Sequence, residues 1–485
     1  RSRGLGDVYK RQAYNNWTIP PRYVVLVGDT DSIPCFTGEG DANPPTDLYY
    51  STFDGDYIPD VAIGRISVKD TFELSSIIKK IVCYEKCDSP LLWLKYAYFI
   101  ASSDNAYHQI AESTHCYSMR RLRKIGIICD SLFLYYGTGT SIYNAINAGR
   151  VIVMYSGHGS DNAWIEPPFY NSDVYNLQNS YKMPFVFSFA CLCGNFTYPV
   201  CFSEAWLRKY PGGAIAHFAS SVVTYWDEDD ILQRKIIDVI CDSGYFMIGD
   251  IINTGKLLFY LHYGDNSITQ GYFERYNLMG DPTLPLFTSV PFSINVEYPK
   301  SVYLTDSITI YVDTGYPLSG VICAVSKDTV FYGFTDDSGK IILQNPAKDT
   351  GEVTLCVWGK NLKTFLSQIK VISKKVEYYP ESLIALKDSL LTVRVIDVHP
   401  SGILCYLKGV ELNLSGVTDD SGYCYFHFCP QYGETLLLEV FDKNIPIKVA
   451  SIPVIAKNSF TFADVSPDSI KIGRESKINF ECSED

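Results

Sequence analysis

Apolar runs alternate with helical patterns over about the first 290 residues, and this alternation limits the fold more than any other feature of the chain. The buried run "YVVLVGD" (23–29) precedes "DTFELSSIIKKIVCYEKC" (70–87), in which apolar residues recur at helical spacing. "LKYAYFIASSD" (94–104) and "YHQIAESTHCYSMRRLRKIG" (107–126) repeat this pair. Strands that alternate with helices predict an α/β domain, with a mostly parallel sheet and helices on both of its faces.

The character of the sequence changes after "GDPTLPLF" (280–287), where helical periods end and short β runs split by turns begin. "TDDSGKIIL" starts at Thr335 and "TDDSGYCYF" starts 83 residues later at Thr418. This internal repeat has the length of one β-sandwich. Each Asp-Asp-Ser-Gly turn between β runs is also a hairpin signal. We therefore expect two complete immunoglobulin-like sandwiches after the α/β part.

A length of 485 residues also requires several domains. The opening "RSRGLGDVYKRQ" resembles translated sequencing-adapter sequence and is expected to be foreign to the fold. The predicted parts are a non-native leader (1–12), an N-terminal α/β subdomain (13–95), a second α/β subdomain (96–288), two sandwiches (289–373 and 374–456) and the truncated start of a further β domain (457–485).

Composition excludes several classes of protein. The net charge of −13 argues against a nucleic-acid partner. No apolar run reaches the ~20 residues that a membrane-spanning helix needs. No signal peptide is recognisable and the first residue is not Met, so we expect a piece of a longer protein, with any cell-surface attachment in a missing C-terminal part. The 15 cysteines show no zinc-finger spacing, and they leave the redox compartment open.

Two reactive side chains follow apolar runs of the α/β part. His158 comes after "RVIVMY", between two glycines, and Cys191 comes directly after "FVFSFA". In parallel sheets the active site lies at the carboxyl ends of the strands, so neighbouring strands would bring both residues to one edge. A cysteine thiolate attacks carbonyl carbon when a base and oxyanion donors are at hand. Taken singly, however, such a turn is more often structural and such a cysteine more often belongs to the core.

Four segments together resemble the gingipain-type cysteine peptidases: "NAGRVIVMYSGHGSDNAW" (147–164), "MPFVFSFACLCGNF" (183–196), "CFSEAWLR" (201–208) and "MGDPTLPLF" (279–287). The resemblance covers about residues 20 to 290 and implies the caspase-like α/β fold, commonly followed by an immunoglobulin-like domain. His158 and Cys191 fall on the family's catalytic pair. The amides of Gly159 and Cys191 are then the expected oxyanion donors.

The third expected catalytic residue is Asp104. The family places an acidic residue near the histidine, at the end of the preceding strand, and "FIASSDNAY" provides this carboxylate. It would fix the orientation of the imidazole. Alternatively, Asp104 only caps the helix that starts near Ala106, which is a common role for aspartate.

Substrate-binding residues are expected at Ser156, Trp226 and Asp230. Trp226 matches a family residue that lines the primary specificity pocket, and Asp230 falls where lysine-selective members carry an acidic residue. Arginine-selective members carry their acidic residue in the segment after Asp104, where Tyr107 is the nearest counterpart here. The alternative is that the acidic run 227–230 is a solvated first turn of a helix, favoured by the helix dipole.

The resulting prediction is a secreted or surface-bound cysteine endopeptidase of bacterial type that cleaves proteins or peptides after a basic residue, lysine rather than arginine. No cofactor is required for this chemistry. The acidic loop between Asp29 and Asp60 offers oxygen ligands for a structural calcium ion, which family members bind, although no ligand set can be named. A sortase-like transpeptidase acting in surface-protein secretion and a non-catalytic adhesin are the two alternatives.

Overall fold

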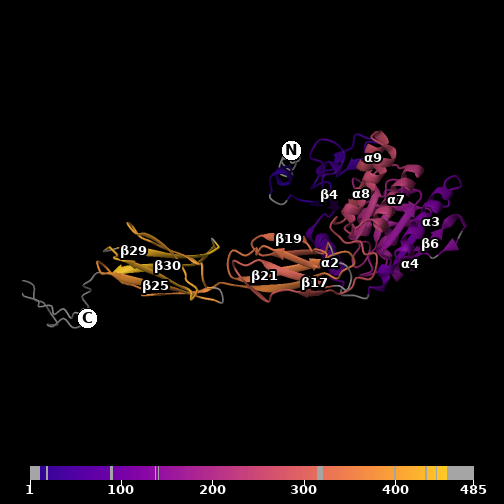
Figure 1. The fold of residues 1–485 in the computed structure, drawn as a ribbon. Coiled ribbons are helices and arrows are strands. Elements are labelled where there is room, and N and C mark those ends of the chain that lie inside the picture. Colours follow the sequence, from indigo (N-terminus) through magenta and orange to yellow (C-terminus); the bar gives the residue numbers. More distant parts are fainter. Residues whose placement is uncertain are drawn as a thin grey trace, which may run out of the picture.

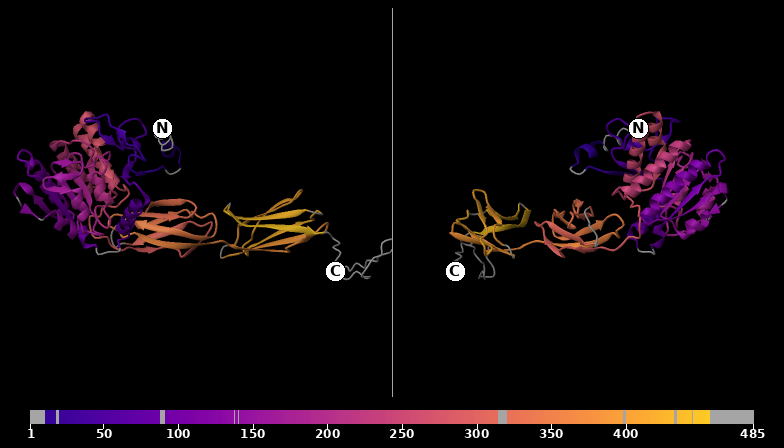
Figure 2. Two further views of the ribbon diagram at one scale, coloured as in Figure 1. Left: turned by 180° about the vertical axis from the view of Figure 1, so that it is seen from behind. Right: turned by 45° about the vertical axis from the view of Figure 1, so that its right-hand side comes forward.

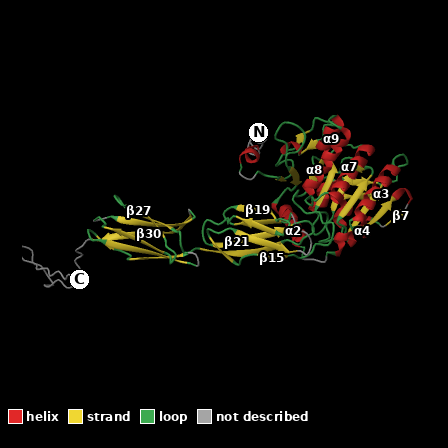
Figure 3. Ribbon diagram, in the orientation of Figure 1, coloured by secondary structure: helices red, strands yellow, loops and turns green. Residues whose placement is uncertain are grey.

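The computed structural model describes residues 11–17, 20–87, 91–136, 138–139, 141–313, 320–397, 400–431, 434–443 and 445–455. An α/β domain lies at one end of an elongated molecule, and two β-sandwiches follow it in a row (Figures 1 and 2). Helices belong to the α/β domain and the sandwiches consist of strands and loops (Figure 3). Of the predicted leader only Arg11 and Gln12 are described, and the predicted further β domain (457–485) lies outside the described residues.

One nine-stranded sheet forms the centre of the α/β domain, in the order β1-β4-β14-β13-β12-β8-β5-β6-β7. Its strands are β1 (Tyr23–Val27), β4 (Ala62–Ile66), β5 (Tyr96–Ala101), β6 (Ile128–Phe133), β7 (Thr138–Gly139), β8 (Ile152–Ser156), β12 (Phe185–Phe189), β13 (Ala216–Ser220) and β14 (Tyr276–Met279). Neighbours are parallel except for the pairs β13–β14 and β6–β7. The sheet is therefore mostly parallel, as the alternation of strands and helices predicts.

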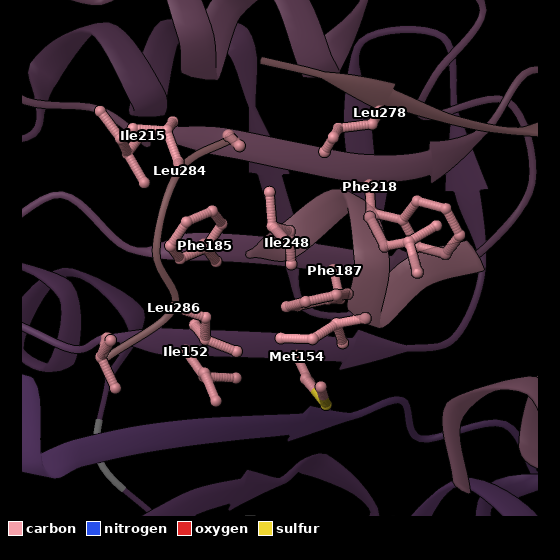
Figure 4. Close-up of a cluster of buried hydrophobic side chains, with 14 of the residues drawn as sticks. Ile152, Met154, Phe185, Phe187, Ile215, Phe218, Ile248, Leu278, Leu284 and Leu286 are labelled. Carbon is pink, nitrogen blue, oxygen red and sulfur yellow. The ribbon is translucent and has the colours of Figure 1, made fainter. Parts of the chain in front are cut away.

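Helices cover both faces of this sheet. They are α2 (Thr71–Lys86), α3 (His108–Lys124), α4 (Ile142–Ala148), α5 (Asn171–Asn176), α6 (Phe202–Arg208), α7 (Trp226–Asp242), α8 (Ile248–Tyr263) and α9 (Ser267–Arg275). Consecutive strand residues point to opposite faces, so Met154 and Phe187 pack in the core under α2, α3, α7 and α8 (Figure 4). Val153 and Val186 pack in the second core, which α4, α5 and α6 cover.

One sheet runs through both predicted α/β subdomains, across the expected boundary at residue 95. Strand β4, from the N-terminal part, pairs in parallel with β14, with Arg65 opposite Met279. The fully buried Arg65 side chain donates to both carboxylate oxygens of Asp47, at 2.7 and 2.6 Å. A hydrophobic pattern shows where a strand lies but not which distant strand it joins. The pairing of β4 with β14 therefore could not be read from the sequence.

Each sandwich is a pair of sheets of three and five strands. In the first, β15-β17-β20 faces β16-β22-β21-β18-β19; in the second, β23-β25-β28 faces β24-β30-β29-β26-β27. The first sandwich contains β15 (Asn295–Glu297), β16 (Ser301–Tyr303), β17 (Ile308–Asp313), β18 (Ile322–Ser326), β19 (Val330–Phe334), β20 (Lys340–Leu343), β21 (Gly351–Trp358) and β22 (Phe365–Ile372). The second contains β23 (Lys375–Tyr379), β24 (Leu383–Ile384), β25 (Ser389–Ile396), β26 (Leu404–Lys408), β27 (Asn413–Val417), β28 (Tyr423–Phe428), β29 (Thr435–Asp442) and β30 (Ile445–Ile455).

The Asp-Asp-Ser-Gly turn is not a hairpin, contrary to the prediction. Strand β19 before the turn pairs with β18, whereas β20 after it pairs with β17 in the other sheet. The Asp336 carboxylate accepts hydrogen bonds from the backbone of Ser338 and Lys340, at 2.9 Å each, so the turn is closed locally without strand pairing. Asp419 does the same in the second sandwich. The repeat therefore marks where the chain crosses between sheets.

We predict that the α/β domain folds without the sandwiches. The buried clusters of the α/β domain and of the two sandwiches share no residue. The joint between the domain and the first sandwich includes hydrogen bonds from Thr288 and Ser289 to Asn361 and from Lys360 to the Ser243 carbonyl. A chain of residues 11–288 should show the circular dichroism spectrum of a folded α/β domain. Its melting temperature should lie only a few degrees below that of the same domain in the full-length chain. An insoluble or unfolded product would mean that the first sandwich completes the α/β core.

Candidate active site

His158 and Cys191 lie at the same edge of the sheet because their strands are in register. Strands β8 and β12 pair in parallel, and the last residue of β8, Ser156, lies opposite the last residue of β12, Phe189. Each candidate residue comes two positions after its strand ends. The sequence prediction that the carboxyl ends bring the two side chains to one edge therefore holds in the structure.

The loops that carry these two residues touch at Gly159. A Cβ atom at this position would lie 2.4 Å from the Cys191 carbonyl oxygen and 2.7 Å from the Cys193 sulfur, so only glycine fits. The backbone of His158 is fixed as well, since its carbonyl accepts from the Tyr155 hydroxyl at 2.6 Å and from the amide of Ile165 at 2.9 Å. The histidine therefore stands on a rigid turn against the cysteine loop.

Asp104 holds the imidazole of His158. The Nε2 atom of His158 lies 2.9 Å from Oδ2 of Asp104, and a carboxylate can only accept, so Nε2 carries the proton. The other ring nitrogen, Nδ1, is then the one that can take up a proton. Oδ1 of Asp104 accepts from the amides of Ala106 and Tyr107, at 2.7 and 2.8 Å. The bond from His158, followed by these amides, lowers the pKa of Asp104.

The capping and orienting interpretations of Asp104 are thus both satisfied, by different oxygens of one carboxylate. Helix α3 begins at His108, just beyond the two amides that Asp104 caps. The same contacts that start the helix fix the carboxylate for His158, so the cap is part of the site.

The thiol of Cys191 is half-buried and accepts a hydrogen bond from the amide of Thr224 at 3.3 Å. Cys193, two residues later, is completely buried beside the carbonyl of Ala163. Burial raises the pKa of the Cys193 thiol far above its usual range. A buried thiol that resists ionisation is a poor nucleophile, so Cys193 is the less suitable of the two cysteines for that role.

Trp226 forms an aromatic wall beside the histidine. It is the first residue of α7, and its ring meets the His158 ring edge-on, with centroids 5.5 Å apart. Its face stacks on Tyr107, with centroids 5.3 Å apart and an interplanar angle of 13°. Ser156 lies deeper: it is buried at the end of β8, and its carbonyl accepts from the amide of Ser102. The structure therefore brings Trp226, and not the Ser156 side chain, to the surface around His158.

Asp230 already has a cationic partner. Its carboxylate lies 3.0 Å from Nε of Arg234, one helical turn further along α7, and its side chain is 15% exposed. Partial burial raises the pKa of Asp230, and the guanidinium of Arg234 opposes that rise. Any cation from a substrate would have to share this carboxylate with Arg234.

Asp229, in the first turn of α7, is a buried residue of this region that was not predicted from the sequence. Its carboxylate accepts from the hydroxyls of Tyr272 and Tyr276, at 3.1 and 2.6 Å. Burial raises the pKa of Asp229 to about 7, against these hydrogen bonds. Helical spacing was the available signal, since Leu232 and Ile236 share its buried face.

Three carboxylates of the acidic loop pair with arginine side chains. Asp29 pairs with Arg208 at 3.1 Å, Asp41 pairs with Arg275 at 3.0 Å, and Asp47 pairs with Arg65. Across the described ranges, no group of three or more His, Cys, Asp or Glu side chains is arranged to hold a metal ion. The structural calcium ion expected from the sequence stays a prediction.

Within the described part of the chain, no helix is long and apolar enough to cross a membrane.

Comparison with known proteins identifies relatives for most of this chain. The model for peptidase family C25 matches residues 8–287, which includes the end of the segment 1–12 that we expected to be foreign. Lys-gingipain of Porphyromonas gingivalis is 29% identical over 341 residues, covering 64% of this chain and 19% of that protein. Gingipain R2 of the same species is 28% identical over 385 residues, covering 75% of this chain and 51% of that protein. The chain thus spans between about a fifth and a half of these relatives.

The fold agrees with this relationship. The crystal structure of the Arg-specific cysteine proteinase gingipain R aligns with a TM-score of 0.67 and 26% sequence identity, covering 76% of this chain and 88% of that one. A complex of the RgpB pro- and mature domains from Porphyromonas gingivalis aligns equally well, covering 90% of that chain. The resemblance to gingipain-type cysteine peptidases is confirmed, and since the family model matches more than half of its length, the chain belongs to peptidase family C25.

Proposed function

We propose that the protein is a cysteine endopeptidase in which Cys191 is the nucleophile and His158 the general base. The observation that carries this proposal is the shared register of β8 and β12, which places both residues two positions beyond paired strand ends. The contact of Gly159 with the Cys191 carbonyl supports it. A secreted or cell-surface location and protein substrates belong to the same proposal.

The reaction begins when Nδ1 of His158 takes the proton from the Cys191 thiol. The thiolate attacks the scissile carbonyl carbon, and the amides of Gly159 and Cys191 donate hydrogen bonds to the resulting oxyanion. His158 then gives its proton to the departing amine, which leaves a thioester on Cys191. Water, deprotonated by His158, hydrolyses this thioester and restores the thiol.

Asp104 acts on the reaction through His158. Its carboxylate accepts the Nε2 proton, which keeps Nδ1 as the basic nitrogen and stabilises the imidazolium that forms after proton transfer. The lowered pKa of Asp104 keeps this carboxylate charged at neutral and mildly acidic pH. Asp104 is therefore a positioning residue of the proposed site.

Selectivity for a basic residue before the cleaved bond is part of the proposal. Relatives include both Lys-gingipain and an Arg-specific gingipain R, and the Trp226 ring offers a flat wall for an aliphatic stem. Asp230 lies one helical turn beyond Trp226, and its carboxylate would pair with the substrate cation. Arg234 shares that carboxylate, so the compact ammonium of lysine fits the remaining space better than a second guanidinium.

The first prediction tests the catalytic pair. Cys191→Ala should lower kcat/KM for peptide hydrolysis by about 10⁴-fold or more, and His158→Ala should be comparably severe, because the two act as one unit. Both variants should keep the wild-type melting temperature within a few degrees. The matched control is Cys193→Ala, whose buried sulfur takes no part in the reaction. Full activity of Cys191→Ala would refute the assignment, and release of an amide on addition of an amine nucleophile would indicate transpeptidation.

The second prediction separates the two roles of Asp104. Asparagine can still accept hydrogen bonds from the amides of Ala106 and Tyr107 through its oxygen. Its amide nitrogen cannot accept the hydrogen bond that Nε2–H of His158 donates. Asp104→Asn should therefore keep the melting temperature and lower kcat by roughly 10²- to 10⁴-fold. Asp104→Ala should lose both the cap and the activity. If Asp104→Asn retained wild-type kcat from about pH 5 to pH 8, the carboxylate would only be a cap.

The third prediction concerns the residue before the cleaved bond. On fluorogenic peptides that vary only at this position, Asp230→Asn should lower kcat/KM for lysyl substrates by about 10- to 1,000-fold and leave neutral ones nearly unchanged. Arg234→Met removes the competing cation and should raise kcat/KM for lysyl substrates. Asp227→Asn, on the exposed side of the same turn, is the matched control. A wild-type preference for apolar or acidic residues would exclude basic selectivity while leaving the catalytic pair intact.

A further inference from the structure

The second sandwich contains two cysteines that face each other across its core. Cys405 lies in β26 of the five-stranded sheet and Cys424 lies in β28 of the three-stranded sheet. Both belong to one buried cluster, with side chains 0% and 4% exposed. Because the strands belong to opposite sheets, a bond between these side chains would join the two layers of the sandwich.

The side chains of Cys405 and Cys424 belong to the same buried cluster and converge beside Gly416. Gly416 of β27 lies directly opposite Cys405 in the strand register. A Cβ atom at Gly416 would lie 2.5 Å from the sulfur of Cys424, so this sulfur occupies the space that the glycine leaves beside Cys405.

The first sandwich shows which residue occupies the position of Cys424 when that position is not a cysteine. Cys323 of β18 pairs with Gly333 of β19, as Cys405 pairs with Gly416. A Cβ atom at Gly333 would meet Cδ1 of Ile341 at 2.9 Å, and Ile341 occupies the position of Cys424 in the repeat. The glycine and the first cysteine thus occur in both copies, whereas the second cysteine replaces an aliphatic core residue only in the second sandwich.

We propose that Cys405 and Cys424 form a disulfide that joins the two sheets of the second sandwich. The oxidant is an external disulfide, either a low-molecular-weight one or that of a thiol–disulfide oxidoreductase. One cysteine thiolate attacks a sulfur of this disulfide and releases one thiol as a mixed disulfide forms. The other cysteine then attacks the mixed disulfide and releases the second thiol. The two cysteines lose two electrons and two protons, and the external disulfide gains them.

Burial of the pair determines when this exchange can take place. Both residues are buried in the folded sandwich, so the oxidant must reach them before the sheets close. The bond therefore forms during folding and closes a loop that contains the Asp-Asp-Ser-Gly turn.

The test is refolding of the reduced full-length chain in a mixture of reduced and oxidised glutathione, followed by peptide mapping without reduction. We expect a peptide pair linked through Cys405 and Cys424. After reduction of this bond, the slowest amides of β26 and β28 should exchange hydrogen on the order of 10²-fold faster. Amides of β18 and β20, in the first sandwich, should not change. Neither measurement uses peptidase activity, so the result is independent of the proposed function.

Two variants provide controls within the same sandwich. Cys424→Ile copies the first sandwich and should remove both the linked peptides and the effect of reduction on exchange. Cys429→Ser removes the exposed cysteine near the end of β28 and should change neither. Thiol forms of Cys405 and Cys424 in the refolded wild-type chain, or a link from either one to Cys429, would overturn the proposal.

Discussion

Backbone hydrogen bonds between β8 and β12 determine the geometry on which the proposed site depends. They pair Ile152 with Phe185 and continue to Ser156 opposite Phe189. A shift of one residue would move one loop by about 3.3 Å along the sheet and turn every side chain of that strand to the other face. Met154 would leave its core if β8 shifted, and Phe187 would leave the same core if β12 shifted (Figure 4). Packing on both faces thus fixes the register, and the register fixes where His158 and Cys191 meet.

A buried arginine side chain fixes the loops next to the sheet. Arg275 is completely buried and donates to the carbonyl of Val223 at 2.7 Å and to the carboxylate of Asp41 at 3.0 Å. Val223 precedes Thr224, whose amide donates to the thiol of Cys191. The Arg275 side chain therefore holds both the loop that contacts Cys191 and the acidic loop near the N-terminus.

Much of this arrangement was predictable from local patterns. Strands and helices of the α/β domain follow the spacing of apolar residues, and His158 and Cys191 follow from their positions after two such strands. The ion-pair partners of charged residues were harder to predict from the sequence. Arg65 and Asp47, or Arg275 and Asp41, meet only after the chain has folded, and nothing in their local sequence specifies the pairing. The acidic run therefore suggested a calcium site, and nothing in it indicated that Asp29, Asp41 and Asp47 pair with arginines.

The sandwiches show the same limit in another form. The Asp-Asp-Ser-Gly repeat correctly indicated two similar units, but the turn was interpreted as a hairpin because its composition is that of a hairpin turn. Whether two strands pair across a turn depends on their other neighbours. In both copies the strand before the turn already pairs with an earlier strand, β18 or β26, and the strand after it completes the opposite sheet. Composition determines the turn, and the rest of the domain determines what the turn connects.

The acidic start of α7 shows how helix geometry assigns different roles to similar residues. Successive residues of a helix point about 100° apart, so the carboxylates of the run 227–230 cannot share one environment. Asp227 points to solvent, Asp229 is buried against Tyr272 and Tyr276, and Asp230 meets Arg234. A solvated helix turn, the simpler interpretation of this run, describes Asp227 but not the other two. Because Asp229 is buried and Asp230 already pairs with Arg234, the proposed attraction of this helix for a cationic substrate would depend on how firmly Arg234 holds Asp230.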